Sequence, residues 1–227
     1  MKKFWVMFVV FVAIVSFSLD IPKEFGKSKT VEYKVKVVMT DGIRIYYPQF
    51  SSEHRKLNEI IYDLVEKRWS SWEKALLEQL KIYKKGITAG KPEYYLVFSV
   101  KRFDDRIISI LFEEMAYTGG AHPMNYLFAI NYDLAADEEL SLKDLFIDGY
   151  NYKEVINKRV KEFFEVNKQS VIAEFRTIKD NQDFYLTDYG IIIFFQRYEY
   201  TCYAFGNPEI PIPYRVFEDK FKREYLP

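Results

Sequence analysis

A single long stretch of helical periodicity, residues 53–85, constrains the fold of this chain more than any other feature. Large side chains recur along it every third or fourth position, which gives an α-helix one apolar face. Lys84 and Lys85 suit the negative end of a helix dipole, and Gly86 is the residue type that most often ends a helix. We expect this helix to pack against a sheet, with Trp69 and Trp72 in the core. Its predicted inner face comprises Leu57, Ile61, Leu64, Arg68, Trp72, Leu76, Leu80 and Tyr83.

Segments with the alternation typical of β-strands lie on both sides of this helix. Residues 30–39 alternate apolar and charged side chains, and Asp41-Gly42 turns them into a hairpin partner at 43–47. Beyond the helix, residues 103–105 join two further strands into a second hairpin. The strands predicted after the helix are 93–102, 106–117, 126–133, the hairpin pair 183–187 and 191–195, and a proline-containing edge strand at 209–213.

Shorter helical signals occur in the second half of the chain. Residues 141–146 resemble a capped helical turn, and Asn151 with Glu154 three residues later is typical of a helix start. A further short helix is expected from Tyr214 onward. Because helices and hairpins occupy separate blocks, the sequence predicts an α+β fold of antiparallel sheets packed by one long and one shorter helix.

The first residues have the pattern of an export signal. Lys2 and Lys3 are positively charged, and residues 4–17 form an uncharged, predominantly apolar run of 14 residues. Small side chains at Ser16 and Ser18 predict cleavage before Leu19. The run is short for a membrane span, which needs about 20 apolar residues, although retention as an uncleaved anchor is the alternative. We therefore expect the mature protein to be secreted, periplasmic or otherwise extracytoplasmic.

The remaining chain suits one compact unit made of two halves, residues 30–133 and 140–218, after a signal peptide at 1–18. Lysine plus arginine equals aspartate plus glutamate, at 33 each, so no net field favours nucleic acid or an anionic membrane. Any membrane contact is expected only through an uncleaved N-terminal segment. The oligomeric state is left open by the sequence.

Cysteine and histidine are too scarce for two common kinds of site. Cys202 is the only cysteine, so no disulfide can form within the chain, and we expect this thiol to act as a small buried apolar group. One cysteine and two histidines do not make a zinc ligand set. We therefore predict no metal and no cofactor.

Several ordered motifs resemble those of the RsiV/PdaC-like family of exported domains of unknown function. The family includes the outer part of a lysozyme-sensing anti-sigma factor and the N-terminal domain of a peptidoglycan deacetylase. Nearly the whole chain after the apolar run is covered. The motifs are Tyr-Thr-Gly-Gly-Ala-His at 117–122, Asn-Tyr-Asp at 131–133, Leu-Ser-Leu-Lys-Asp-Leu-Phe at 140–146, Phe-Tyr-Leu-Thr-Asp-Tyr-Gly at 184–190, Tyr-Glu at 198–199, Tyr-Ala-Phe-Gly at 203–206 and Glu-Ile-Pro-Ile-Pro-Tyr at 209–214.

The departures from the family limit what this resemblance implies. Only three residues precede the apolar run, so the cytoplasmic segment expected of an anti-sigma factor has no counterpart. The deacetylase activity of the relative resides in a separate domain. Phe103-Asp104-Asp105 is weakly similar to an acidic motif of that domain, but Arg106 occupies the position where glycine is expected.

Tyr117-Thr118-Gly119-Gly120-Ala121-His122 carries three candidate binding groups beside Tyr117. Gly119 and Gly120 can present backbone N–H groups to an anion or a glycan oxygen, or simply allow a sharp bend. The imidazole of His122 can act in binding or as a general base, although no partner carboxylate is evident. Alternatively, its ring hydrogen-bonds backbone groups and fixes the loop.

The second candidate segment runs from Tyr198 to Gly206 and includes Tyr200 and Tyr203. These tyrosines can form a stacking platform, or they can pack beneath the turn at 206–208. If they bind a ligand, we expect them to meet His122 at one end of a sheet, around a shared concavity.

The leading hypothesis is a non-catalytic binding domain for cell-envelope material, such as peptidoglycan or another glycan, or for a lysozyme-like protein. One alternative is a cell-wall hydrolase or deacetylase with an unrecognised site. The other is an envelope scaffold whose motifs only maintain the fold.

Overall fold

The computed structural model describes residues 33–87 and 90–227. The predicted signal peptide, its cleavage site and residues 30–32 of the first predicted strand lie outside these ranges. No helix within the described residues is long and apolar enough to cross a membrane.

The strands are β1 Lys34–Thr40, β2 Ile43–Gln49, β3 Glu93–Phe103, β4 Ile107–Tyr117, β5 Met124–Asp133, β6 Glu138–Glu139, β7 Phe184–Leu186, β8 Gly190–Phe194 and β9 Glu209–Pro213. The α-helices are α1 Arg55–Lys84 and α2 Tyr152–Val166. Short 3-10 helices span Ser52–His54, Leu142–Leu145, Lys168–Ser170, Tyr203–Phe205, Tyr214–Lys220 and Arg223–Tyr225.

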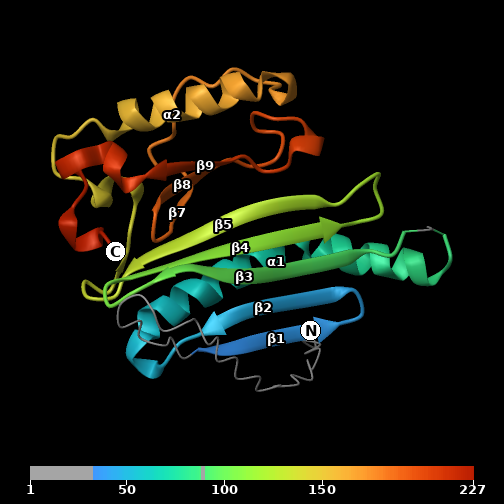
Figure 1. Cartoon of the computed structure of the whole chain (residues 1–227). Coiled ribbons are helices and arrows are strands. Elements are labelled where there is room, and N and C mark those ends of the chain that lie inside the picture. The colour runs from blue at the N-terminus through green and yellow to red at the C-terminus, as the bar shows by residue number, and fades with distance from the viewer. Residues whose placement is uncertain (1–32, 88–89) are drawn as a thin grey trace, which may run out of the picture.

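The elements form layers, with two sheets stacked between two helices (Figure 1). The larger sheet has the order β1-β2-β3-β4-β5-β6, and the smaller one has the order β7-β8-β9. Helix α1 covers the outer face of the larger sheet, and α2 covers the outer face of the smaller sheet. This arrangement confirms the predicted α+β class. The proline-containing strand β9 lies at a sheet edge, as expected.

One strand pair differs from the antiparallel hairpins predicted. Strands β2 and β3 run parallel, with Ile43 opposite Tyr94 and Ile45 opposite Leu96. Parallel neighbours need a long crossover connection, and the chain between these strands is the helix α1. The long helix therefore determines the mixed topology: it carries the chain across the sheet face before β3 begins.

Helix α1 buries the face that its periodicity predicted. Leu57, Ile61 and Leu76 are fully buried against the sheet. Trp69 and Trp72 are partly buried at the margin of this core. The helix ends at Lys84, and Gly86 just beyond it adopts a φ of 71° and donates its N–H to the Tyr83 carbonyl at 2.8 Å, as expected of a glycine at a helix end.

The second half is organised around α2 and a capped turn. Ile156, Val160 and Phe164 are the buried side chains of α2. In the turn before it, Asp144 accepts hydrogen bonds from both the backbone and the hydroxyl of Ser141, so Asp144 has a capping role. Asn151 precedes α2 but does not cap its backbone, because its side chain donates to Glu154 instead.

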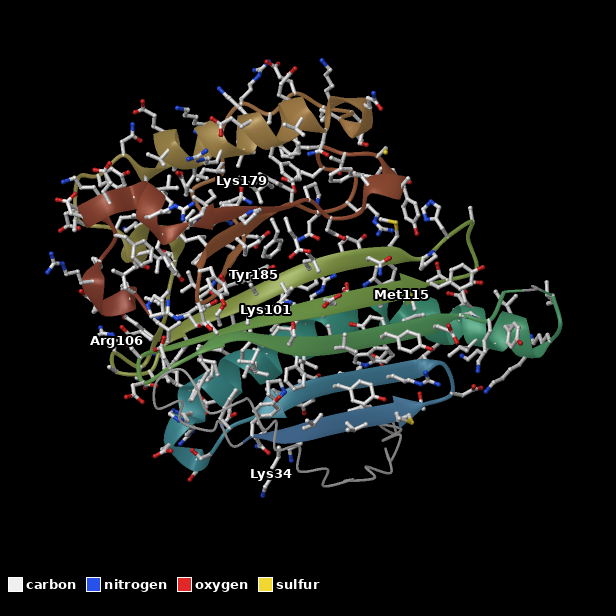
Figure 2. The ribbon with its side chains drawn as sticks, in the orientation of Figure 1. Lys34, Lys101, Arg106, Met115, Lys179 and Tyr185 are labelled. Atoms are coloured by element: carbon white, nitrogen blue, oxygen red, sulfur yellow. The ribbon has the colours of Figure 1, made fainter. Side chains whose placement is uncertain are left out.

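The two sheets are joined by a small apolar layer and by buried polar groups. Leu111, Leu127, Tyr185 and Phe194 form the apolar layer, and Figure 2 shows Tyr185 and Lys101 between the sheets. Asn131 accepts from the Ser109 hydroxyl at 2.7 Å and donates to the Phe184 carbonyl at 2.9 Å. The Ser109 hydroxyl in turn accepts from the Leu186 N–H at 2.9 Å. These bonds fix the position of β7 on the larger sheet.

Candidate functional site

Three aromatic side chains from the two predicted segments meet at one end of the stacked sheets. The His122 ring lies 3.8 Å from the Tyr203 ring, centroid to centroid, and 6.4 Å from the Tyr198 ring. The Tyr198 hydroxyl lies 3.4 Å from His122 Nε2. The Tyr203 hydroxyl donates to the Pro123 carbonyl at 2.9 Å, which ties the second segment to the loop after β4. We call His122, Tyr198 and Tyr203 the ring cluster.

A rigid turn positions Tyr198 in this cluster. The Gln196 side-chain amide exchanges two hydrogen bonds with the backbone of Leu127 in β5, at 3.1 and 2.8 Å. Glu199 closes the turn by accepting from the Gln196 N–H at 3.0 Å. Between these anchors, Tyr198 adopts a φ of 67°, which is unusual for a bulky residue, and its side chain is 46% exposed. The anchored turn therefore holds Tyr198 in a backbone conformation that costs free energy, while its ring is exposed to solvent.

The remaining predicted site residues lie elsewhere. Tyr117 packs at the start of β3, where its hydroxyl leaves no room for a side chain at Gly90. Gly119, with a φ of 91°, lies near Gln79 of α1, whereas Gly120 faces open space. Tyr200 packs against Phe164, Phe175 and Phe195 in the core of the second half rather than beside His122. Gly206 has a φ of 86°, which favours glycine, and it lies beside Arg197.

A groove of about 350 Å³ lies between the two sheets beside the ring cluster. Arg197 lines it and also places its guanidinium 4.2 Å from the centre of the Tyr203 ring. The ring cluster itself does not line this groove and is connected to it through Arg197. The groove residues are Tyr95, Val97, Glu113, Glu114, Met115, Asn125, Tyr126, Leu127, Arg197, Asn207 and Glu209.

His122 is exposed and has few polar neighbours. Its Nδ1 lies 3.2 Å from the carbonyl of the next residue, Pro123, and its Nε2 faces the Tyr198 hydroxyl. Within residues 33–87 and 90–227, no group of three or more histidine, cysteine or acidic side chains is placed to hold a metal ion. Cys202, the single cysteine, is partly buried rather than fully buried.

A buried carboxylate lies between α1 and the larger sheet, at a position that no sequence motif marks. Glu114 is 1% exposed and forms an ion pair with Arg68 at 2.6 Å. It also accepts from Trp72 Nε1 at 3.2 Å and from the Tyr94 hydroxyl at 2.7 Å. Burial, followed by the charge of Glu114, raises the pKa of Tyr94. Arg68 interrupts an otherwise apolar helix face, and that interruption was the available signal for a buried acid.

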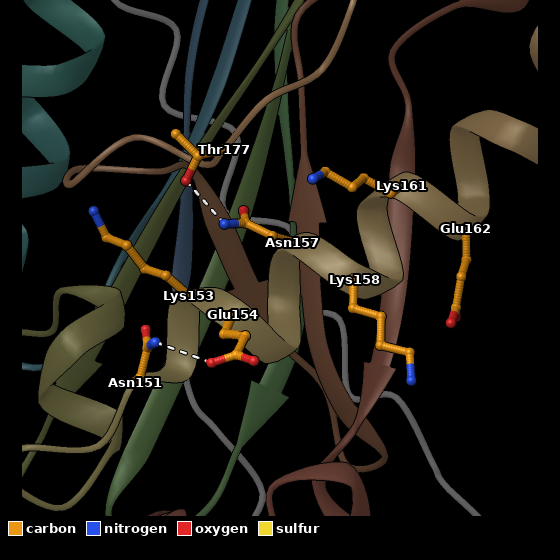
Figure 3. Close-up of a pocket in the computed structure, with 8 residues that line it drawn as sticks. All are labelled: Asn151, Lys153, Glu154, Asn157, Lys158, Lys161, Glu162 and Thr177. Carbon is orange, nitrogen blue, oxygen red and sulfur yellow. Dashed lines mark hydrogen bonds between the residues drawn. The ribbon is translucent and has the colours of Figure 1, made fainter.

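A larger hollow of about 640 Å³ runs along the solvent side of α2. Figure 3 shows that its lysines do not converge, since Lys153 and Lys158 point away from each other. Lys153 is already paired with Asp180. Asn157 and Thr177 hydrogen-bond to each other at 2.9 Å (Figure 3). The hollow is therefore a solvated helix face without convergent groups.

Sequence comparison matches the two halves of the chain to different family descriptions. The family described as "Deacetylase PdaC" matches residues 27–125, and the family described as "Protein of unknown function (DUF3298)" matches residues 143–215. A curated relative, the peptidoglycan-N-acetylmuramic acid deacetylase PdaC of Bacillus subtilis (strain 168), is 22% identical over 205 residues. The alignment covers 85% of this chain but only 42% of that enzyme.

Solved structures show the same fold. A DUF3298 family protein from Pseudomonas aeruginosa PAO1 superposes with a TM-score of 0.62 at 20% identity, covering 89% of this chain and 99% of that one. A second, from Bacteroides fragilis, superposes with a TM-score of 0.58 at 20% identity, covering 85% of this chain and 94% of that one. These solved structures share the α+β fold of this chain. The chain is similar to the PdaC family over residues 27–125 and to the DUF3298 family over residues 143–215, which is the resemblance that its motifs predicted.

Proposed function

We propose that this protein is a non-catalytic, extracytoplasmic domain that binds cell-envelope glycan. The observation that carries the proposal is the exposed ring cluster beside a groove between the two sheets. Tyrosine rings offer sugars an apolar face together with a polar tip, and a prearranged cluster loses little entropy on binding. The ring cluster stands on a turn that is anchored to β5 and to the loop after β4, so its geometry is set before a ligand arrives.

The family relationship supports an envelope role. The B. subtilis relative is named as an enzyme acting on peptidoglycan, and this chain aligns with part of it. Within the described part of the chain, the neighbours of His122 are the side chains of Tyr198 and Tyr203 and the backbone carbonyl of Pro123, with no acidic side chain in hydrogen-bond or ion-pair contact. A binding role uses these groups as they stand, whereas general-base catalysis by His122 needs a further partner.

Retention on purified insoluble peptidoglycan tests this proposal. The wild-type protein is expected to sediment with the polymer, and Tyr198→Ala and Tyr203→Ala are expected to remain largely in the supernatant. Tyr189→Ala is the matched control, because Tyr189 is 86% exposed in the β7–β8 turn and belongs to neither the cluster nor the groove.

Two parallel measurements separate the alternative functions. Release of reducing ends or acetate from the same peptidoglycan would show an enzyme and contradict the non-catalytic proposal. Binding to a lysozyme without retention on peptidoglycan would show that the partner is a protein. Equal retention of all four proteins would contradict a role for the ring cluster.

A further inference from the structure

Arg197 is the groove residue that has a buried polar atom without a hydrogen-bond partner in the described part of the chain. Its Nε is sealed from solvent and has no hydrogen-bond partner among the described residues. None of the described carboxylates forms an ion pair with its guanidinium, whose one described contact is the ring of Tyr203. Because this Nε is sealed, a ligand in the groove can reach only the terminal NH1 and NH2 groups of the guanidinium, which are not buried.

The surroundings hold this guanidinium in place for a ligand. Tyr203 supports one face of it, and Gly206 lies beside its NH2, where an added Cβ would make only an ordinary contact at 3.7 Å. Gly206 also needs its positive φ of 86°, so a larger residue would be strained there. Arginine presents its N–H groups in a planar fork that matches a carboxylate in two-point contact.

We propose that Arg197 binds a carboxylate carried by the ligand, so that the groove selects acidic over neutral saccharides. This inference rests on the proposed glycan-binding function and specifies its ligand class. Three carboxylates, Glu113, Glu114 and Glu209, also line the groove. Glu114 is paired with Arg68, and Glu209 accepts from the Tyr185 hydroxyl at 2.6 Å. They disfavour a polyanion, so the ligand carries one isolated carboxylate among neutral groups. Asn125 and Asn207 supply amides that suit hydroxyl and acetamido groups.

Titration calorimetry with three matched disaccharides tests the inference. The acidic probe is N-acetylglucosaminyl-N-acetylmuramic acid, and the neutral probes are its methyl ester and di-N-acetylchitobiose. Wild-type protein is expected to bind the acid about tenfold more tightly than the ester, which is the effect of one charge-assisted hydrogen bond. This preference should shrink as salt rises from about 0.02 to about 0.5 M, because the attraction is partly screened.

Variants assign the preference to Arg197. Arg197→Gln is expected to bind acid and ester alike. Arg197→Lys keeps the charge without the planar fork and should retain only part of the preference. Arg215→Gln is the control, since Arg215 is an exposed arginine outside the groove, and it should behave as wild type.

The outcomes distinguish this inference from the proposed function. Equal binding of acid and ester by the wild type would overturn the role of Arg197 and leave glycan binding standing. Failure of all three probes to bind would overturn both. A preference that survives in Arg197→Gln would also overturn the inference, and if that variant does not fold, Arg197→Lys and the salt dependence decide.

Discussion

The two ends of the sheet interface differ in how their arginines are paired. Among the described residues, each end has one buried arginine nitrogen without a hydrogen bond, Arg102 NH2 and Arg197 Nε, but Arg102 forms an ion pair with Asp104 whereas Arg197 contacts a tyrosine ring. Figure 2 shows Arg106 and Met115 at opposite ends of β4. At the Arg106 end, the closed end, Arg106 pairs with the fully buried carboxylate of Asp133 at 2.7 Å. Arg102 is 2% exposed and donates to the Tyr214 hydroxyl at 3.1 Å and the Tyr225 carbonyl at 2.7 Å. These bonds hold the C-terminal segment against the sheets.

At the Met115 end, the open end, the polar groups remain available. Arg197 has a buried Nε without an acceptor, His122 is exposed, and Tyr198 holds a strained backbone conformation. Both ends join the same two sheets, so the difference does not come from the layered architecture. The closed end uses its charges to hold elements together, whereas the open end keeps its charge and rings beside a groove. This contrast favours the open end as the functional one.

The largest expected effect at the closed end follows from removing Arg102. Arg102→Ala leaves Asp104 without its ion-pair partner and removes the donors to Tyr214 and Tyr225. We expect the free energy of unfolding to fall by about 3 kcal/mol, measured by urea denaturation. Arg159→Ala, an exposed arginine paired along α2, should change it by less than about 0.5 kcal/mol. A similar small change in both variants would show that the closed end is not locked by Arg102.

A smaller loss is expected from Asn131→Ala. This change leaves the Ser109 hydroxyl and the Phe184 carbonyl with one partner fewer in a buried layer, at a cost of about 2 kcal/mol. The double variant with Ser109→Ala should cost less than the two single variants added together, because both remove the same connection. Additive losses would contradict a shared polar bridge. Asn181→Ala, at an exposed asparagine, is the control.

The pH dependence of stability tests the Arg106–Asp133 pair. Burial alone would raise the pKa of Asp133, but hydrogen bonds from Ala136, Arg106 and Ala135 outweigh it and hold the pKa below its ordinary value. As pH falls, the unfolded chain therefore takes up this proton first, and the stabilisation declines through the folded-state pKa. The stability difference between wild type and Asp133→Asn should shrink between about pH 5 and about pH 2. A difference that is unchanged across that range would refute the assignment.

Local patterns predicted the elements better than their arrangement. The periodicity of residues 53–85 and the turn residues at Asp41-Gly42 fixed the main helix and the first hairpin, because these signals depend on neighbours in sequence. The parallel pairing of β2 with β3 and the stacking of the two sheets depend on contacts between distant segments. No local periodicity encodes those contacts, so the sequence predicted hairpins where the sheet is mixed.

The candidate site was predicted only in part for the same reason. His122, Tyr198 and Tyr203 do meet, as the motifs suggested, but Tyr200 lies in the aromatic core. In an irregular turn, alternate tyrosines face different surroundings, and sequence alone does not say which face is buried. Arg197 carries no motif and emerges only from its place in the groove. The absence of a metal requirement stays a prediction, to be checked by unfolding and binding after chelation.

We expect the smallest effect on stability from substitutions in the ring cluster. These substitutions test the difference between the closed end and the open end most directly. His122→Ala and Tyr198→Ala remove exposed side chains that hold no buried partner, so each should change the free energy of unfolding by less than about 0.5 kcal/mol. The same variants should weaken retention on peptidoglycan. If the cluster served only to maintain the fold, each change would instead cost about 1–3 kcal/mol by orphaning buried groups. Urea unfolding and sedimentation of the same variants therefore decide between a binding surface and a fold determinant. Lost stability with unchanged retention on peptidoglycan would contradict our assignment of the open end as the functional one.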